Sequence, residues 1–307
     1  MLIDTLTSTL PAGTPGQRFR DELARASPLP IVGTMNAFSA ILAQRAGHKA
    51  IYLAGGGLAT HAYGLPDLAL TTMTEVLAEV RRITDACDLP LMVDVDTGFG
   101  GALNIARLLQ GLIKDGAAAM HIEDQIVLKR CGHRPNKGLV PTTEMLDRIK
   151  ACVDARTDST FFLVARTDAL ASEGLQASID RACAYLEAGA DMIFAEACTE
   201  LSQYRAFAEA LGRPHALLAN VTEFSLTPSF TQAELAGAGV AAALYPLSAA
   251  RAMAHAATVV FQTILREGSQ QSVLDIMQTR AQLYEALNYE AYEARYDALH
   301  AANDGKS

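Results

Sequence analysis

A short sequence pattern that occurs four times constrains the fold of this 307-residue chain more than any other feature. In each copy a helix-like segment ends at a glycine, and a short apolar run follows. Glycine commonly ends helices because it adopts positive φ without the steric penalty of a Cβ atom. The apolar run then predicts a strand that is buried on both faces. The copies are centred on Gly47, Gly116, Gly189 and Gly239.

Four further apolar runs lie between these copies and bring the predicted strands to eight. The further runs are 30–33, 91–94, 161–165 and 216–219. Helical periodicity fills the intervals, at 38–46, 74–86, 103–115, 142–155, 175–188, 201–211 and 249–266. Regular alternation of strand and helix predicts an α/β fold, a (β/α)₈ barrel of the TIM type. A doubly wound parallel sheet is the alternative.

Beyond the predicted barrel, residues 269–300 read as two more amphipathic helices. We therefore expect a single domain over residues 1–307, with the barrel at about 17–267 and a helical extension at about 268–300. Additional helices after a closed barrel often pack on a neighbouring subunit. The sequence thus predicts an oligomer.

Composition narrows the class of protein. The chain holds 25 Lys and Arg against 34 Asp and Glu, a net charge of −9, which disfavours nucleic acid and anionic membranes as partners. Half of the residues are hydrophobic, which excludes a disordered chain. We expect no membrane span and no signal peptide, since neither pattern occurs. The five cysteines form no CxxC pair, as expected for reduced thiols in the cytoplasm.

Ionisable residues gather where the predicted strands end, which is where barrel enzymes carry their active sites. Five of the eight predicted strands end in or beside one, namely Asp94 with Asp96, Glu123, Arg166 with Asp168, Glu196, and Glu223. Three carboxylates at one barrel mouth repel each other unless a cation joins them. Because their oxygens are hard ligands, Asp94, Asp96 and Glu123 predict Mg²⁺ or Mn²⁺. The alternative is a solvated structural acid cluster.

The segment after the fourth predicted strand is basic and contains a thiol. Lys129 precedes Cys131, and Gly132 and His133 follow it. Flanking cations stabilise a thiolate, and this makes a thiol a working acid or base near neutral pH. The same cations form a candidate anion site. A solvated basic loop with an incidental thiol is the alternative.

Weaker candidates lie at other strand ends. The run 55–57 is three glycines, which can cradle an anion with backbone N–H groups or simply form an ordinary loop. Arg166 and Arg251 are candidate carboxylate clamps. His121 lies within a predicted strand and is more often a core histidine than a ligand. The glycines at 98–101 lack the context of a nucleotide-binding loop.

Three motifs together resemble the isocitrate lyase/phosphoenolpyruvate mutase superfamily. They are DVDTGFG at 94–100, HIEDQ at 121–125 and KRCGH at 129–133. The longer run KRCGHRPNK at 129–137 is similar to the 2-methylisocitrate lyase branch. So are the stretches 165–170, 218–228, 243–251 and 275–289. The resemblance covers residues 17–300, nearly the whole chain.

The resemblance implies a Mg²⁺-dependent barrel, with Mn²⁺ as an alternative ion. The implied reaction is retro-aldol cleavage of a tricarboxylate, (2S,3R)-2-methylisocitrate, into pyruvate and succinate. That reaction belongs to the methylcitrate cycle of propionate breakdown. The branch also implies a homotetramer whose subunits exchange their C-terminal helices.

The resemblance further implies a role for individual residues. Asp94 would bind the metal directly, while Asp67, Asp96 and Glu123 would hold metal-bound waters. Cys131 would protonate the succinate carbanion, and Arg166 would bind the pyruvate portion; Glu123 and His133 complete the implied catalytic set. The implied lining residues are Ala54, Gly55, Gly56, Lys129, Gly132, Glu196, Asn220, Thr222, Arg251 and Arg280. Phe194, Leu244 and Pro246, in a chain without tryptophan, would leave room for the substrate's methyl group.

One departure from the branch affects the expected substrate. Ala54 stands where these proteins usually have serine, so a hydroxyl near the pyruvate end is missing. This keeps open a lyase or decarboxylase for a related acid such as dimethylmalate or oxaloacetate. A binding protein that retains the pocket without turnover is a third hypothesis.

Overall fold

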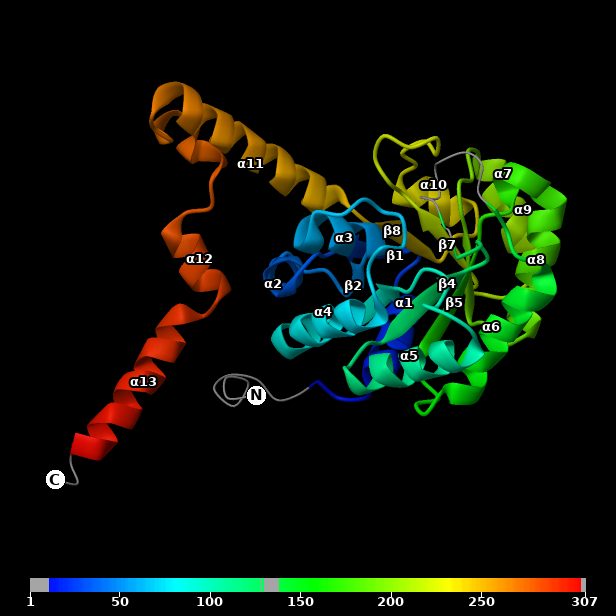
Figure 1. The fold of residues 1–307 in the computed structure, drawn as a ribbon, viewed down its shortest axis with the longest axis horizontal. Helices are drawn as coiled ribbons and strands as arrows, with labels where there is room; N and C mark the ends of the chain where they lie inside the picture. The colour runs from blue at the N-terminus through cyan, green and yellow to red at the C-terminus, as the bar shows by residue number, and fades with distance from the viewer. Residues whose placement is uncertain (1–10, 128, 130–137, 305–307) are drawn as a thin grey trace. The chain divides into compact units, whose positions relative to one another are not determined.

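The computed structural model describes residues 11–127, 129 and 138–304. It contains two compact units, a barrel unit at Gly13–Ala250 and a C-terminal unit that begins at Arg251. The barrel unit holds eight strands in a closed barrel, in the order β1 to β8, with helices around it (Figure 1). The predicted (β/α)₈ fold is confirmed. The single-domain boundaries stay a prediction.

All eight strands occur where the sequence predicts them. Their bounds are β1 Leu29–Gly33, β2 Ala50–Leu53, β3 Leu91–Asp94, β4 Ala119–Glu123, β5 Phe162–Thr167, β6 Met192–Ala195, β7 Leu217–Asn220 and β8 Ala242–Tyr245. Every neighbouring pair is parallel, and β8 closes on β1. Almost every strand residue is buried. Burial on both faces explains why the strands appear as continuous apolar runs.

The seven predicted helices occur within one residue of their expected ends. They are α2 Ala37–Arg45, α4 Met73–Ala86, α5 Ala102–Lys114, α6 Thr142–Ala155, α8 Leu175–Glu187, α9 Leu201–Leu211 and α11 Ser248–Glu267. The prediction missed α1 Pro15–Arg25, α3 Gly55–Tyr63, α7 Leu170–Glu173 and α10 Gln232–Gly237. The last two are too short to show a helical period, and α3 begins with three poor helix formers.

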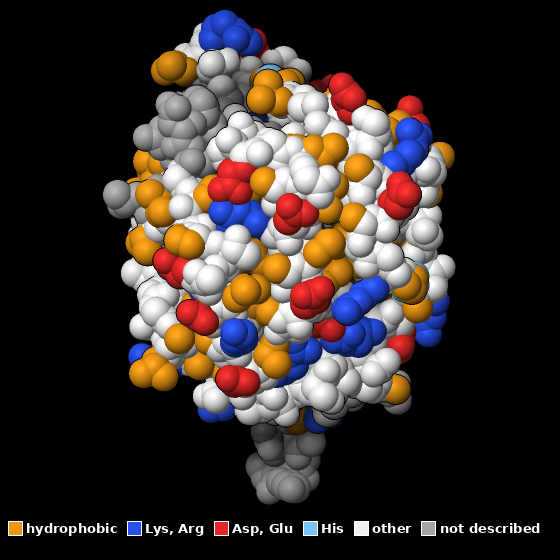
Figure 2. Space-filling model, turned by 90° about the vertical axis from the view of Figure 1, so that its right-hand side faces the viewer, with side chains coloured by type: hydrophobic (Ala, Val, Ile, Leu, Met, Phe, Trp, Pro, Cys, Tyr) orange, Lys and Arg blue, Asp and Glu red, His pale blue; other side chains and the backbone are white. Residues whose placement is uncertain are grey.

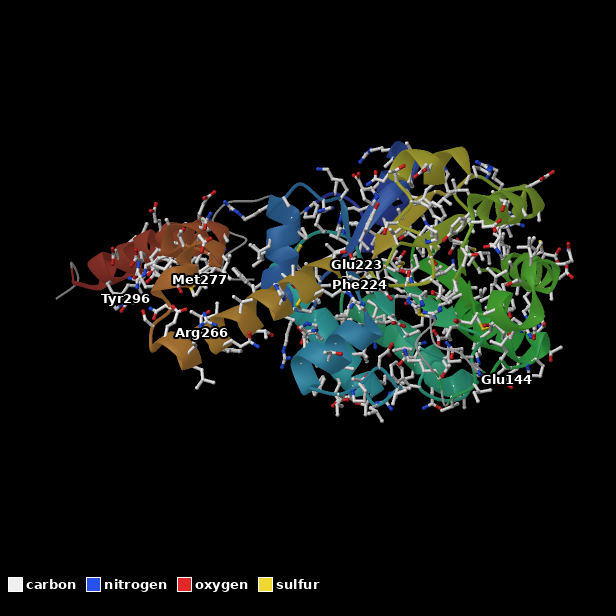
Figure 3. All side chains as sticks on the ribbon, turned by 90° about the horizontal axis from the view of Figure 1, so that it is seen from above. Glu144, Glu223, Phe224, Arg266, Met277 and Tyr296 are labelled. Atoms are coloured by element: carbon white, nitrogen blue, oxygen red, sulfur yellow. The ribbon has the colours of Figure 1, made fainter. Side chains whose placement is uncertain are left out.

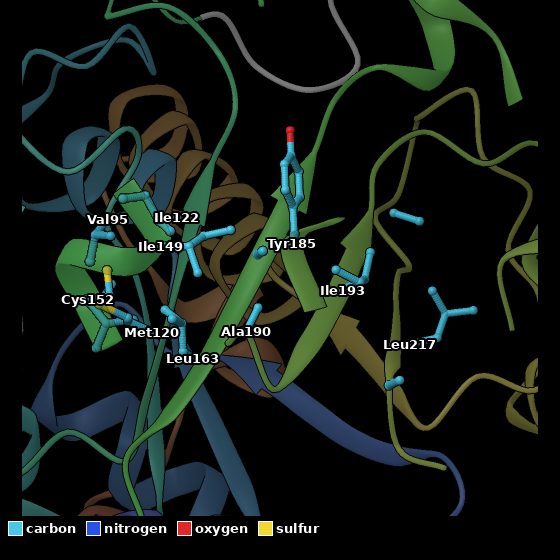
Figure 4. Close-up of a cluster of buried hydrophobic side chains, with 14 of the residues drawn as sticks. Val95, Met120, Ile122, Ile149, Cys152, Leu163, Tyr185, Ala190, Ile193 and Leu217 are labelled. Carbon is cyan, nitrogen blue, oxygen red and sulfur yellow. The ribbon is translucent and has the colours of Figure 1, made fainter. Parts of the chain in front are cut away.

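The apolar core has an inner and an outer layer. The inner layer fills the barrel, and Phe19 of α1 closes its lower end against Phe162, with ring centroids 5.1 Å apart. The outer layer lies between the strands and the surrounding helices, where Ile149 and Cys152 of α6 face Leu163 of β5 (Figure 4). On the face in Figure 2, acidic and basic side chains are interspersed, so the net negative charge forms no single patch there.

The C-terminal unit continues from α11. It contains a 3-10 segment, Gln271–Ile276, followed by α12 Arg280–Ala286 and α13 Tyr289–Asp304. Tyr284 stacks on Tyr289 at 4.4 Å and joins the last two helices. The sequence predicts two helices here, one through residues 273–277 and one through residues 283–296. The first is instead the 3-10 segment, and the second is divided into α12 and α13. Figure 3 labels Arg266, Met277 and Tyr296 in this unit. No helix among the described residues has the length and apolarity needed to cross a membrane.

Candidate active site

The carboxyl ends of five neighbouring strands bring ionisable and polar side chains to one mouth of the barrel. Asp94 ends β3, Glu123 ends β4, Arg166 lies one residue before the end of β5, Glu196 follows β6, and Asn220 ends β7. The strand register pairs Glu123 with Arg166. All five side chains are buried. The sequence-predicted strand-end residues therefore do converge.

The first turn of α3 holds Asp94. Gly55 N–H donates to Asp94 Oδ2 at 2.9 Å, and Asp96 N–H donates to Oδ1 at 3.0 Å. A Cβ atom on Gly55 would lie 2.9 Å from Asp94 Oδ2, and one on Gly56 would lie 3.0 Å from Asp67. The ordinary-loop reading of 55–57 is therefore wrong, because these glycines form a helix start that carboxylates approach closely. The helix N-terminus also carries partial positive charge.

Several non-glycine residues in the loops that follow the strands at the mouth have strained backbones, and three of them come soon after a strand end. Asp96 follows β3 with φ +50°, Ala197 follows β6 at φ +60°, and Phe224 follows β7 at φ +60°. Residues other than glycine rarely adopt this region, and such strain gathers at functional sites. Backbone bonds hold Asp96 there, since its carbonyl accepts from Glu123 N–H at 3.0 Å.

Lys129 lies among carboxylates and not in the expected anion site. Its ammonium pairs with Asp67 at 2.8 Å and still more closely with Asp96. Burial alone would lower the pKa of Lys129, but the surrounding carboxylates outweigh burial and raise it well above its usual value. The expected contact of Lys129 with substrate stays a prediction. Here the ammonium neutralises the proposed metal-binding acids.

The carboxylates differ in their proton affinity. Burial raises the pKa of Asp96 to about 6, against the attraction of Lys129. Burial also raises the pKa of Glu123 well above its usual range, and neither of its oxygens has a hydrogen-bond donor. For Asp94 burial is outweighed by electrostatic attraction to His121, Lys129 and Arg166 and by the Asp96 N–H donor, and its pKa falls.

His121 contacts the site from inside the barrel. Its Nε2 lies 2.8 Å from the Tyr52 hydroxyl and 3.5 Å from Asp94 Oδ1. Burial lowers its pKa to about 4, so the ring is neutral at pH 7. The sequence reading placed it in the core but missed its contact with Asp94. Strand alternation was the available signal, because residues two apart in a strand share a face and Glu123 is already a candidate.

Arg166 is the central cation of the mouth. Its guanidinium makes two hydrogen bonds to Asp168, at 2.9 and 3.1 Å, and lies 3.4 Å from Glu123 and 3.7 Å from Glu196. The carboxylates raise its pKa although burial opposes them. The planar fork also lies over the Phe194 ring, 5.1 Å from its centroid. Asp168 was already noted as a strand-end residue, but the sequence assigned it no role; here it orients Arg166.

The remaining candidates are placed as follows. Asn220 Nδ2 lies 3.3 and 3.5 Å from the two Glu196 oxygens, and Thr222 is buried just after β7. Phe194 and Leu244 belong to the inner core, while Pro246 is partly exposed. Cys131, Gly132 and His133 lie outside the described residues. Arg251 and Arg280 belong to the C-terminal unit, so their membership of the site stays a prediction.

The donor set fits a hard divalent cation that keeps water ligands. Among the described residues, no three His, Cys, Asp or Glu side chains are arranged to hold a metal on their own. Asp94 and Asp96 nonetheless lie close together at the mouth, and both buried oxygens of Glu123 lack donors. Mg²⁺ usually binds through one or two carboxylates and retains several waters. The residues present therefore fit the implied ion.

A model of the phosphoenolpyruvate phosphomutase family matches residues 19–265. The chain belongs to this family. It is 59% identical to the 2-methylisocitrate lyase of Salmonella typhimurium, over 94% of this chain and 97% of that protein. A solved 2,3-dimethylmalate lyase superposes with a TM-score of 0.85 at 32% identity, covering 94% of this chain and 96% of that one. Phosphonopyruvate hydrolase solved with oxalate and Mg²⁺ gives 0.80 at 28% identity, over 92% and 98%.

The comparisons confirm the resemblance inferred from the three motifs. Relatives that are 55–59% identical to this chain all bear the name 2-methylisocitrate lyase. They indicate that the chain is an enzyme and a carbon–carbon lyase. This disfavours the hypothesis of a binding protein without turnover.

Proposed function

We propose that this enzyme cleaves (2S,3R)-2-methylisocitrate into pyruvate and succinate, as a step of the methylcitrate cycle. The observation that carries the proposal is 59% identity to a 2-methylisocitrate lyase over nearly the full length of both chains. The mouth of the barrel supports it, since buried acids and one buried arginine converge there. With a divalent cation bound by these acids, the cation and Arg166 together would attract a substrate that bears three carboxylates.

We propose Mg²⁺ as the cofactor, with Mn²⁺ as a possible replacement. Asp94 would hold the ion directly, and Asp67, Asp96 and Glu123 would hold its waters. A bound divalent cation stabilises negative charge that develops on the pyruvate oxygens. A relative of the same fold solved with Mg²⁺ supports this assignment.

The side chains have separate tasks in the proposed cleavage. The hydroxyl proton leaves, the carbon–carbon bond breaks, and the succinate carbon receives a proton. Arg166 would bind the pyruvate carboxylate through its fork, which Asp168 holds in place. Cys131 would donate the proton to the carbanion, while Lys129 and His133 would supply positive charge beside it. Glu196 and Asn220 would line the remaining carboxylates.

The proposed methyl pocket is apolar. Phe194 and Leu244 are buried in the inner core near the carboxyl ends of β6 and β8, and Pro246 follows. The chain contains no tryptophan that would fill this space. An extra methyl group gains by leaving water for such a pocket, which favours 2-methylisocitrate over isocitrate.

A second candidate is a lyase for a smaller 2-hydroxy acid such as dimethylmalate, or a decarboxylase of oxaloacetate. The observation that favours it is Ala54, which begins α3 without a side-chain hydrogen bond to the helix. The solved 2,3-dimethylmalate lyase has the same fold, and this keeps the candidate in view.

We further propose a cytoplasmic homotetramer. Large apolar side chains of the C-terminal unit are exposed in the single chain, with Phe261 at 71%, Leu265 at 88% and Tyr296 at 63%. Large apolar side chains that are exposed in a single chain are often covered by a neighbouring subunit. The four described cysteines are free thiols, which favours a reducing compartment. Size-exclusion chromatography with light scattering tests the tetramer.

Pyruvate release from 2-methylisocitrate in the presence of Mg²⁺ tests the function. We expect the wild-type protein to form pyruvate and succinate in equal amounts. The Cys131→Ala variant is the control, since it removes the proposed proton donor. Release no faster than from this control would overturn the proposal.

A further inference from the structure

Asp124 has no role in the proposed reaction, yet it is fully buried beside Glu123. Its carboxylate accepts three hydrogen bonds from two directions. Oδ2 accepts from the Thr167 hydroxyl at 2.8 Å and from the Tyr185 hydroxyl at 2.9 Å. Oδ1 accepts from Asp168 N–H at 2.9 Å. One side chain thus joins the ends of β4 and β5 to α8.

These bonds lead to the central cation of the mouth. Asp168, whose N–H the Asp124 carboxylate holds, makes the two-point contact with the Arg166 guanidinium. The Asp124 N–H also donates to the Arg166 carbonyl at 3.2 Å. Asp124 therefore fixes both the backbone of Arg166 and the residue that orients its side chain.

A second branch reaches the backbone just after residues 130–137. The Asp124 carbonyl accepts from Val140 N–H at 2.9 Å, and Arg181 donates to the Val140 carbonyl at 3.1 Å. Arg181 also donates to the Tyr185 hydroxyl at 3.2 Å and lies 3.6 Å from Asp124 Oδ2. Glu173 holds the far side of Arg181 with two bonds of 2.7 Å.

Burying this network costs free energy, because charged groups lose their contact with water. Two buried carboxylates, Asp124 and Asp168, lie close to each other, and apolar residues of similar size would often stabilise a core as well or better. Tyr185 lies in the outer core layer, and Figure 4 shows its hydroxyl at the end toward which the strand arrows point. The ring of Tyr185 therefore packs in the apolar layer, while its hydroxyl, the only polar atom of the side chain, reaches Asp124. A satisfied polar network of this kind fixes geometry more sharply than apolar packing does.

We propose that Asp124, Tyr185 and Arg181 are positioning residues that hold Asp168, and through it Arg166, in the geometry needed to bind the substrate carboxylate. The inference rests on the proposed role of Arg166. None of the three touches the reacting atoms. Their contribution reaches the substrate through Asp168.

The Tyr185→Phe variant tests this most cleanly, because it removes one hydroxyl and keeps the buried ring. Loss of an outer partner of this kind typically costs about 10- to 100-fold in activity or affinity. We expect kcat/KM to fall about 10-fold and the Kd of oxalate, measured by calorimetry with Mg²⁺, to rise by a similar factor. Oxalate serves as a small dicarboxylate probe of Arg166.

Ile149→Val is the matched control for stability. Ile149 belongs to the same outer core layer but has no polar side-chain atom that could join the hydrogen-bond network, and the variant lowers Tm without removing a polar atom. If Tyr185 contributes only to stability, both variants should lower Tm and leave kcat/KM and oxalate affinity unchanged. That result would overturn the inference. If Tyr185→Phe does not fold, Thr167→Val removes another donor to the same Asp124 oxygen and carries the same prediction.

A double mutant with Asp168→Asn tests the proposed route. If Tyr185 acts through Asp168, the double variant should be no more impaired than Asp168→Asn alone, whereas independent effects would multiply. Oxalate binding separates this inference from the proposed function. A wild type that binds oxalate but cleaves no candidate substrate contradicts only the proposed function. A wild type that neither cleaves nor binds oxalate overturns both.

Discussion

The two ends of the barrel are made by the same eight strands and are built on opposite principles. At the amino ends of the strands, Phe19 packs against Phe162 with the two rings tilted by 53°, and Arg20 pairs with Asp191 at 2.9 Å. At the carboxyl ends, Asp94, Asp96 and Glu123 are crowded together in a buried mouth. The amino end buries aromatic rings and pairs Arg20 with Asp191, while the carboxyl end leaves oxygens of Asp96 and Glu123 without hydrogen-bond donors.

The contrast indicates that the amino ends of the strands contribute mainly to stability, while the carboxyl ends carry the groups proposed for catalysis. Buried carboxylate oxygens without hydrogen-bond donors and positive φ at Asp96 both cost free energy, and both occur at the carboxyl ends of the strands. In barrel enzymes generally, the active site lies at the carboxyl ends of the strands and the amino ends contribute to stability. Substitutions at the two ends should therefore separate activity from stability.

The largest effect is expected at the mouth. Asp94→Asn removes the proposed direct metal ligand and should lower kcat/KM on the order of 10³-fold, about 4 kcal/mol in the barrier. Its free energy of unfolding should also fall, because the lowered pKa of Asp94 means that the folded state stabilises this charge. The loss of kcat/KM should nevertheless persist under conditions where the variant is fully folded. Steady-state kinetics and urea unfolding measure the two quantities. Glu209→Gln, on the exposed side of α9, is the charge-matched control and should leave both unchanged.

Phe19→Ala should show the reverse pattern at the other end. Phe19 is fully buried, and truncating a buried phenylalanine costs about 3 kcal/mol or more of unfolding free energy. The kcat/KM of the folded variant should match the wild type, because the cavity opens far from the mouth. A large loss of kcat/KM at a temperature where the variant is folded would break the proposed separation of the two ends.

Lys129→Met should strengthen Mg²⁺ binding by about 10-fold, or 1.4 kcal/mol, because the ammonium pairs with two of the proposed metal-binding acids. Titration calorimetry of the substrate-free protein measures the affinity directly. Lys150→Met, on the exposed side of α6, is the control. Weaker Mg²⁺ binding in Lys129→Met would show that the ammonium does not compete with the ion.

The smallest effect is expected at the start of α3. Ala54→Ser supplies a side-chain oxygen to free helix N–H groups, which typically stabilises by about 1 kcal/mol. Tm should rise by about 2 °C. Ala59→Ser, in the same helix but beyond its first turn, offers no cap and should not raise Tm. A fall in the Tm of Ala54→Ser would mean that the first turn has no room for the hydroxyl.

Much of the framework was predictable from the sequence. The repeated pattern predicts strands because a glycine commonly ends the helix and a strand buried on both faces appears as a continuous apolar run. Asp94, Glu123 and Arg166 were predictable for the same reason, since strand ends meet at one mouth. The start of α3 at Gly55 was not predictable, because the Gly55 N–H is stabilised by the Asp94 carboxylate, which is distant in sequence.

Contacts between distant segments account for the rest. Lys129 reads as part of a basic loop, and only the fold brings its ammonium to Asp67 and Asp96. Tyr185 likewise reads as one more apolar position of α8. Its hydroxyl meets Asp124 because α8 packs on β5, and helical periodicity does not report such a contact.

The most direct test of the whole account is a comparison of kcat/KM for four acids with Mg²⁺ present: 2-methylisocitrate, isocitrate, 2,3-dimethylmalate and oxaloacetate. We predict the highest value for 2-methylisocitrate, with pyruvate and succinate formed in equal amounts. A higher value for any of the other three acids would contradict the proposed substrate.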